Sequence, residues 1–117
     1  MDSFYRYNFK AVFLGDGKDA FRKAFVLYLD YGIESVFLDE KPRLISRLCP
    51  FIRTVSLKNI HKDEFILGML DSVVERDTNA THLLFTHPEK FKGFYLRCEG
   101  ELENHFILHP DIVLNDM

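Results

Sequence analysis

Residues 9–40 read FKAVFLGDGKDAFRKAFVLYLDYGIESVFLDE, the pattern of a strand, a glycine loop, a helix and a second strand. The apolar run 9–14 leads into a loop that holds Gly15 and Gly17, and the amphipathic segment 18–31 leads into a second apolar run at 33–38. A glycine loop after the first strand and acidic residues after the second are typical of α/β domains that bind ligands. The opening of the chain therefore predicts an α/β fold.

Strand and helix signals continue to alternate along the rest of the chain. The apolar spacing predicts a short helix within 43–51, a helix over 63–75, and a helix that opens at Pro88 and is bent or broken at Gly100. Further strands are expected at 52–57, 82–86 and 106–108, and period-two alternation places the first of these near a sheet edge. Because short βα units joined right-handedly form parallel sheets, we expect one three-layer α/β/α domain over residues 9–117. Its sheet is mainly parallel with four to five strands, and residues 1–8 are an N-terminal extension.

Composition and charge exclude several classes of protein. The chain has 117 residues, 47% of them hydrophobic, which suits one globular domain with its own core. The net charge of −3, with scattered acids, argues against nucleic-acid binding. Cys49 and Cys98 are expected to be buried thiols in a reducing compartment. No run is long enough to cross a bilayer and no signal peptide opens the chain, so we expect a cytoplasmic protein.

The ends of the predicted strands carry the candidate ligand-binding residues. In a parallel sheet, ligands bind beyond the carboxyl ends of the strands, and these ends share one edge. Here the four ends are the loop of Gly15, Asp16 and Gly17, the pair Asp39 and Glu40, the pair Lys58 and Asn59, and the pair Thr86 and His87. We therefore expect any ligand site at this edge.

The glycine loop permits two interpretations. As G-x-G-x-x-A over residues 15–20, with Asp39 further on, it fits a relaxed dinucleotide-binding fingerprint. Gly15 would allow the tight turn, and Gly17 would allow a ligand to approach the backbone. Against this, Asp16 and Asp19 place negative charge beside the proposed pyrophosphate. A compact strand-to-helix turn needs the same small residues without any ligand.

Each of the remaining polar candidates has both a ligand-binding and a structural interpretation. Asp39 and Glu40 suit a ribose hydroxyl or a ligand amine, or they are a solvated strand end. Arg43 and Arg47 suit a carboxylate or phosphate, or they are a solvated helix face.

The histidines carry the last candidates. Thr86, His87 and Glu89 place a hydroxyl, an imidazole and a carboxylate together, which suits acid–base chemistry or a helix start. His105 and His109 flank an extended run, so we expect no metal there. We expect no catalytic residues in this chain.

The order of segments resembles the N-terminal domain of ATP-grasp carboxylate–amine ligases, in the branch similar to D-aspartate ligase and the carbamoyl-phosphate synthase large chain. It is carried by LGDG at 14–17, YGIESVFLDEKPR at 31–43, LLFT at 83–86, and ELENHFIL at 101–108 followed by Pro110 and Asp111. The resemblance implies a Rossmann-like pre-ATP-grasp fold that does not itself hold the nucleotide. In this family ATP and magnesium are bound by the downstream catalytic module, which activates a carboxylate as an acyl phosphate for attack by an amine.

By the same resemblance, Gly15 and Gly17 match the family's glycine loop, Asp39 its strand-two acid, and Thr86 and Glu89 its segment after strand four. This edge of the sheet borders the acceptor substrate. The chain departs from the family at Asp16 and at His87-Pro88, and it ends at Met117, where the family would enter its ATP-binding subdomain.

Two functions are therefore expected from the sequence. The first is a non-catalytic N-terminal domain, inactive alone and without a cofactor of its own, whose partner is the ATP-grasp module. Residues 112–114, IVL, suggest a chain that continues, and an apolar patch for docking is expected, which an isolated chain would cover by self-association. The alternative is a free-standing module that binds a dinucleotide or small ligand at the edge between Gly15 and Asp39.

Overall fold

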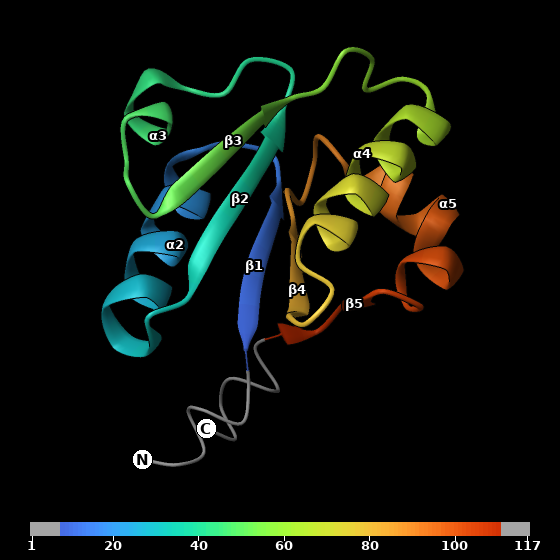
Figure 1. Cartoon of the computed structure of the whole chain (residues 1–117). Coiled ribbons are helices and arrows are strands. Elements are labelled where there is room, and N and C mark those ends of the chain that lie inside the picture. The colour runs from blue at the N-terminus through green and yellow to red at the C-terminus, as the bar shows by residue number, and fades with distance from the viewer. Residues whose placement is uncertain (1–7, 111–117) are drawn as a thin grey trace.

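The computed structural model describes residues 8–110 (Figure 1). Five strands alternate with four helices in this part of the chain. The strands are β1 (Phe9–Leu14), β2 (Glu34–Asp39), β3 (Ile52–Ser56), β4 (Thr81–Thr86) and β5 (Phe106–Ile107). The helices are α2 (Lys18–Tyr31), α3 (Leu44–Arg47), α4 (Asp63–Arg76) and α5 (Lys92–Leu102). The predicted α/β fold is confirmed.

The strands form one sheet in the order β3-β2-β1-β4-β5, and every neighbouring pair is parallel. Phe13 of β1 lies in register with Phe37 of β2 on one side and Phe85 of β4 on the other. The strand order reverses direction between β1 and β4, because β2 and β3 extend the sheet one way and β4 and β5 the other. As predicted, β3 lies at a sheet edge.

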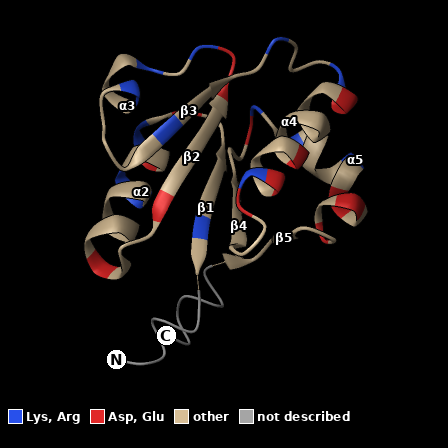
Figure 2. Cartoon of the chain, viewed as in Figure 1, with Lys and Arg blue, Asp and Glu red and all other residues tan. Residues whose placement is uncertain are grey.

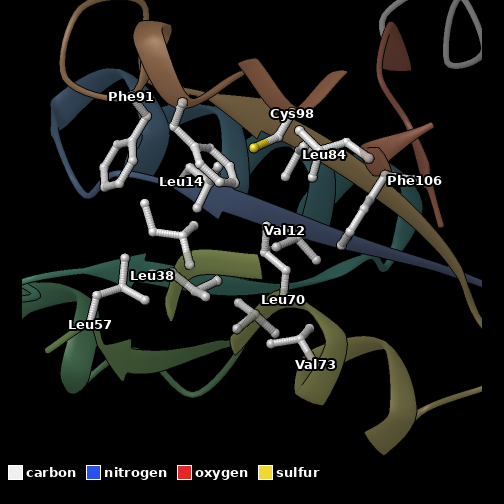
Figure 3. Packing of buried hydrophobic residues seen from close by; sticks show 14 residues of the cluster. Val12, Leu14, Leu38, Leu57, Leu70, Val73, Leu84, Phe91, Cys98 and Phe106 are labelled. Carbon is white, nitrogen blue, oxygen red and sulfur yellow. The ribbon is translucent and has the colours of Figure 1, made fainter. Parts of the chain in front are cut away.

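Helices cover both faces of the sheet, so the domain has three layers (Figure 1). One core, which includes Ala11, Phe13 and Phe37, packs against Ala24 and Leu27 of α2. The other core packs against α4 and α5, and Figure 3 shows its side chains. Leu14, Leu38 and Leu70 there are at most 1% exposed, and burying each contributes about 1.5–3 kcal/mol. These observations define a Rossmann-like α/β domain.

Local hydrogen bonds move several element boundaries from their predicted places. The N–H of Ile33 donates to the carbonyl of Leu27 in the turn that closes α2, so β2 begins only at Glu34. The helix predicted within 43–51 is only the single turn Leu44–Arg47, because Cys49 already bonds back to Ser46 in the following turn.

Two predictions about the last helix were wrong. The segment opened by Pro88 is a turn, and α5 begins only at Lys92, because the N–H groups of Glu89 and Lys90 donate to Nδ1 of His87. The helix then runs through Gly100 to Leu102 without a break.

The two cysteines are free thiols, but only Cys98 is buried as predicted. Cys49 is half-buried, because it lies in the turn between α3 and β3 at the border of the sheet. Residues 1–7 of the predicted extension and the apolar residues 112–114 lie outside the described residues. Within the described part of the chain, no helix is long and apolar enough to cross a lipid bilayer.

His82 is a buried polar residue in β4, only 3% exposed, with its ring edge-on to Phe106. Burial lowers the pKa of His82, and Lys10 lowers it further, while Asp77 opposes the shift. The unfolded chain binds a proton at His82 more readily than the folded chain. Stability is therefore full above about pH 6.5, the ordinary value for histidine, and falls as the pH drops below it.

We therefore expect the free energy of unfolding of the native chain to fall between pH 7.5 and pH 5.5, and to fall less in His82→Gln. Urea unfolding at several pH values measures this. His61→Gln, which alters an exposed histidine, is the control and should keep the native pH dependence. Parallel pH profiles for the native chain and His82→Gln would contradict the prediction.

Candidate functional site

The carboxyl edge of the sheet holds a groove between the ends of β1 and β4, at the point where the strand order reverses. Ligands of parallel α/β domains usually bind at such a point. The groove has a volume of about 830 Å³, which is within the usual range for small-molecule sites. Its walls come from the loop after β1, the first turns of α2, the segment after β4 and residues 108–110.

Five of the eight predicted site residues line this groove: Gly15, Gly17, Thr86, His87 and Glu89. The sequence did not single out Lys18, Lys23 or Pro110, which also line it. His109 lines it as well, although the sequence raised it only as a metal ligand. Asp16, Asp39 and Glu40 are not among the lining residues.

Gly15 is fixed in place by the sheet. Its N–H donates to the carbonyl of Leu38, while the N–H of His87 donates to the carbonyl of Leu14, so both neighbouring ladders extend to this point. Its φ is +108°, and a Cβ there would lie 2.8 Å from Cβ of His87. The predicted role of Gly15 in a tight turn is confirmed, and His87 is what makes the turn crowded.

Gly17 has an open surrounding instead. It is the N-cap of α2 with an extended backbone, φ −149°, and a Cβ there would meet nothing within 4 Å. No side chain caps this helix, so the first N–H groups of α2 lack helical partners beside the groove.

The Asp16 carboxylate is turned inward and is bound by the loop before α3. Its side chain is 1% exposed, and it accepts hydrogen bonds from the Arg43 backbone N–H at 2.6 Å, Arg43 Nε at 3.1 Å and Ser46 Oγ at 2.9 Å. Arg43 also donates to the carbonyl of Gly17 at 2.9 Å. Arg43 therefore grips a carboxylate, as one interpretation of the sequence allowed, but the carboxylate belongs to this chain. Arg47 is exposed and takes no part.

Asp39 is bound in the same manner. One oxygen accepts the N–H of Asp16 at 2.9 Å, and the other accepts the N–H of Glu40 at 2.7 Å and the Lys90 ammonium. Burial alone would raise the pKa of Asp39, but the Lys90 hydrogen bond and the two backbone donors outweigh it, and the pKa is lowered. Lys90 lies 51 positions away in sequence and was missed, because no local pattern joins it to Asp39.

The last residue of β4 carries a polar atom without a partner in the described part of the chain. Oγ1 of Thr86 is buried and has no hydrogen-bond partner among residues 8–110, and Thr86 lines the groove. Nδ1 of His87 accepts two backbone hydrogen bonds, so its proton is on Nε2. The groove can thus offer a ligand the first N–H groups of α2. Residues 8–110 contain no group of three or more His, Cys, Asp or Glu side chains that could hold a metal ion.

Known proteins provide no guide to the use of this groove. No protein-family model matches the chain, no curated protein matches it, and no solved structure matches it. The fold therefore defines the class of this protein, a Rossmann-like α/β domain.

The two glycines of the loop should differ sharply when replaced by the same residue. We expect Gly15→Ser to lower the free energy of unfolding by about 2–4 kcal/mol, because serine is strained at φ +108° and its Cβ meets His87. Gly17→Ser should be neutral or slightly stabilising, because serine is a preferred N-cap. Urea unfolding measures both, and equal costs would contradict this account of the loop.

The buried ion pair can be tested on its own. We expect Asp16→Asn to lower the free energy of unfolding, measured in urea, by about 2 kcal/mol. An amide NH₂ would replace one of the oxygens that accept hydrogen bonds from Arg43 and Ser46. The cost stays moderate because the Arg43 side chain is 36% exposed and can turn to water. Asp19→Asn is the matched control, because Asp19 is an exposed acid in the first turn of α2. We expect it to lower the free energy of unfolding by about 0.5 kcal/mol. A loss at Asp16 no larger than at Asp19 would show that the pair does not hold the loop.

Proposed function

We propose that this chain is the non-catalytic N-terminal domain of an ATP-grasp ligase, which joins a carboxylate, through an acyl phosphate, to an amine. The order of segments in the sequence is the basis for the ligase family, and the parallel three-layer fold is compatible with it. ATP and magnesium would be held by the catalytic module, in the same chain or a separate one. The carboxyl edge would border the acceptor substrate. The free thiols of Cys49 and Cys98 support a reducing compartment, the cytoplasm.

The observation that carries the proposal is an exposed apolar surface on α2 and α3. We define the α2–α3 surface as Phe25, Val26, Tyr28, Leu29, Leu44, Ile45 and Leu48, whose exposed fractions run from 40% to 73%. The two helices connect successive strands, β1 to β2 and β2 to β3, on one side of β1 (Figure 1). Large apolar patches on a soluble domain mark interaction sites.

Aromatic contacts join α2 to the end of the α3 segment. The ring of Phe51, just before β3, stacks on Tyr28 with ring centres 4.3 Å apart and meets the ring of Phe25 edge-on at 5.7 Å. Two aromatic residues of the α2–α3 surface, Phe25 and Tyr28, are therefore held in contact with the segment that leads from α3 into β3. An apolar surface held in this way suits a permanent neighbour such as a catalytic module.

The bound acids argue against a dinucleotide at the glycine loop. A dinucleotide site needs a strand-two acid that is free for the ribose and loop N–H groups that are free for the pyrophosphate. Here Asp39 accepts three hydrogen bonds, and the N–H of Asp16 is already committed to it. These hydrogen bonds support the proposal that this domain does not itself bind the nucleotide.

The test begins with the coding sequence beyond Met117, which we expect to encode the lysines and metal-binding acids of an ATP-grasp module. In that protein, Leu48→Lys should lower the rate at which ADP is formed by about tenfold or more, because a charge would be buried in the docking surface. Leu96→Lys is the matched control, because Leu96 is 62% exposed on α5, away from the α2–α3 surface. Circular dichroism checks that both variants fold.

A stop codon after Met117 with no separate ATP-grasp partner would contradict the proposal, as would equal effects of the two lysines.

A second candidate is a module that binds a small ligand in the β1–β4 groove, favoured by the groove's volume of about 830 Å³ at the point where the strand order reverses. Saturable micromolar binding of a nucleotide or NAD(H), abolished by Gly17→Val, would favour that candidate.

A further inference from the structure

A second pocket lies at the opposite, amino edge of the sheet, away from the β1–β4 groove. It has a volume of about 250 Å³ and is formed by the beginnings of four strands and the end of α4. Figure 2 shows basic residues on β1 and β3 and an acidic residue on β2 between them. The amino edge is not the usual ligand edge of a parallel sheet, so the fold itself does not account for this pocket.

The charges that line the pocket do not cancel. Lys10 of β1 contacts both lining acids, with Nζ 3.1 Å from Oε1 of Glu34 and 4.0 Å from Oδ2 of Asp77. Arg53 and Arg76 have no carboxylate within ion-pair distance in the described part of the chain. Three cations and two acids therefore line the pocket, which leaves one positive charge in excess and neither guanidinium group in an ion pair within residues 8–110.

The fold brings these two arginines to the same place from different elements. Arg53 of β3 is in register with Val36 of β2, so its side chain leaves the sheet on the same face as Val36. Arg76 follows the buried Val73 by three residues on α4 and shares its side of the helix. Val36 and Val73 both line the pocket and belong to one core, so both arginines stand beside the same apolar part of the pocket, Arg53 partly buried and Arg76 exposed.

The two guanidinium groups disfavour each other in the free domain. Burial lowers the pKa of Arg53, and the charge of Arg76 lowers it further. Arg76 by itself suits the C-terminal end of α4, where the helix dipole favours a cation. That explanation does not extend to Arg53, which stands on a strand beside another cation.

We propose that this amino-edge pocket binds a phosphate group, held between the guanidinium groups of Arg53 and Arg76. A phosphate dianion matches two cations in charge, and each guanidinium can donate two parallel hydrogen bonds to its oxygens. The pocket is smaller than the usual range for drug-sized ligands, which suits a phosphate or a small phosphomonoester better than a nucleotide. The inference is independent of the proposed ligase function, because it concerns the other edge of the sheet.

The experiment is a titration of the 117-residue chain with inorganic phosphate, followed by NMR of the arginine Nε–H groups and the His82 ring, which lines the pocket. We expect saturable shifts with half-saturation at about 1 mM or tighter, and binding about tenfold weaker or more in Arg53→Gln, since a charge-assisted hydrogen bond is lost. Arg47→Gln, an exposed arginine on α3, is the matched control and should bind as the native chain does. Arg76→Gln should weaken binding as Arg53→Gln does, and it provides the test if Arg53→Gln fails to fold.

A second readout separates a binding role from a structural one. In buffer without multivalent anions, Arg53→Gln should be at least as stable as the native chain, because the repulsion by Arg76 is removed. Phosphate should then raise the melting temperature of the native chain only. The proposal is overturned by an absence of saturable shifts, by equal binding in Arg53→Gln and Arg47→Gln, or by acetate binding as tightly as phosphate.

Discussion

Burial of β1 on both faces is the constraint from which the other features of this domain follow. Ala11 and Val12 have no exposed surface, and Phe13 and Leu14 are at most 3% exposed, so both faces of the strand need a covering layer. A strand buried this way must also have neighbours on both sides to satisfy its backbone groups. The parallel ladders to β2 and β4 supply them, and the helices supply the two layers.

The same constraint shapes the loop after β1. Because both ladders extend to the end of the strand, the chain has to leave the sheet abruptly between Leu38 and His87, and Gly15 does so with a positive φ. The loop is then held by long-range bonds, from Arg43 to Asp16 and from Asp39 to the N–H of Asp16. Two acids that the sequence offered as ligand-binding groups, Asp16 and Asp39, thus stabilise the loop through internal hydrogen bonds. What remains open to a ligand is the groove on the β4 side, beside Gly17 and Thr86.

The sequence predicted the elements well because their signals are local. Helix α2 has the predicted bounds Lys18–Tyr31, and β1 the predicted bounds Phe9–Leu14, since apolar spacing and the flanking glycines mark them locally. The sequence also predicted the edge at which candidate residues gather, because all strands run parallel. It did not reveal which acids would be bound internally. The partners Arg43 and Asp16 are 27 positions apart, and Lys90 and Asp39 are 51 apart, so only the folded topology pairs them.

The failed boundaries have a related cause. Pro88 is a good first residue for a helix. No local pattern indicates that Nδ1 of His87 instead accepts hydrogen bonds from the N–H groups of Glu89 and Lys90 and so forms a turn. His87 thus crowds Gly15 with its Cβ and orders the start of α5 with its ring. One residue that the sequence offered as a ligand-edge candidate therefore has two structural roles.

The two edges of the sheet differ in whether their charged side chains have partners within the domain. At the carboxyl edge, the buried carboxylates of Asp16 and Asp39 each have a cation and backbone donors, so the domain satisfies these charges by itself. At the amino edge, Arg53 and Arg76 line one pocket, and the two acids there contact Lys10 instead. The helix dipole favours Arg76, but nothing among the described residues offsets the charge of Arg53 beside it, whereas a bound anion would attract both guanidinium groups. The unsatisfied features of this molecule, the arginine pair and the exposed α2–α3 surface, are therefore better indicators of its contacts than the glycine loop, whose polar groups are largely satisfied within the chain.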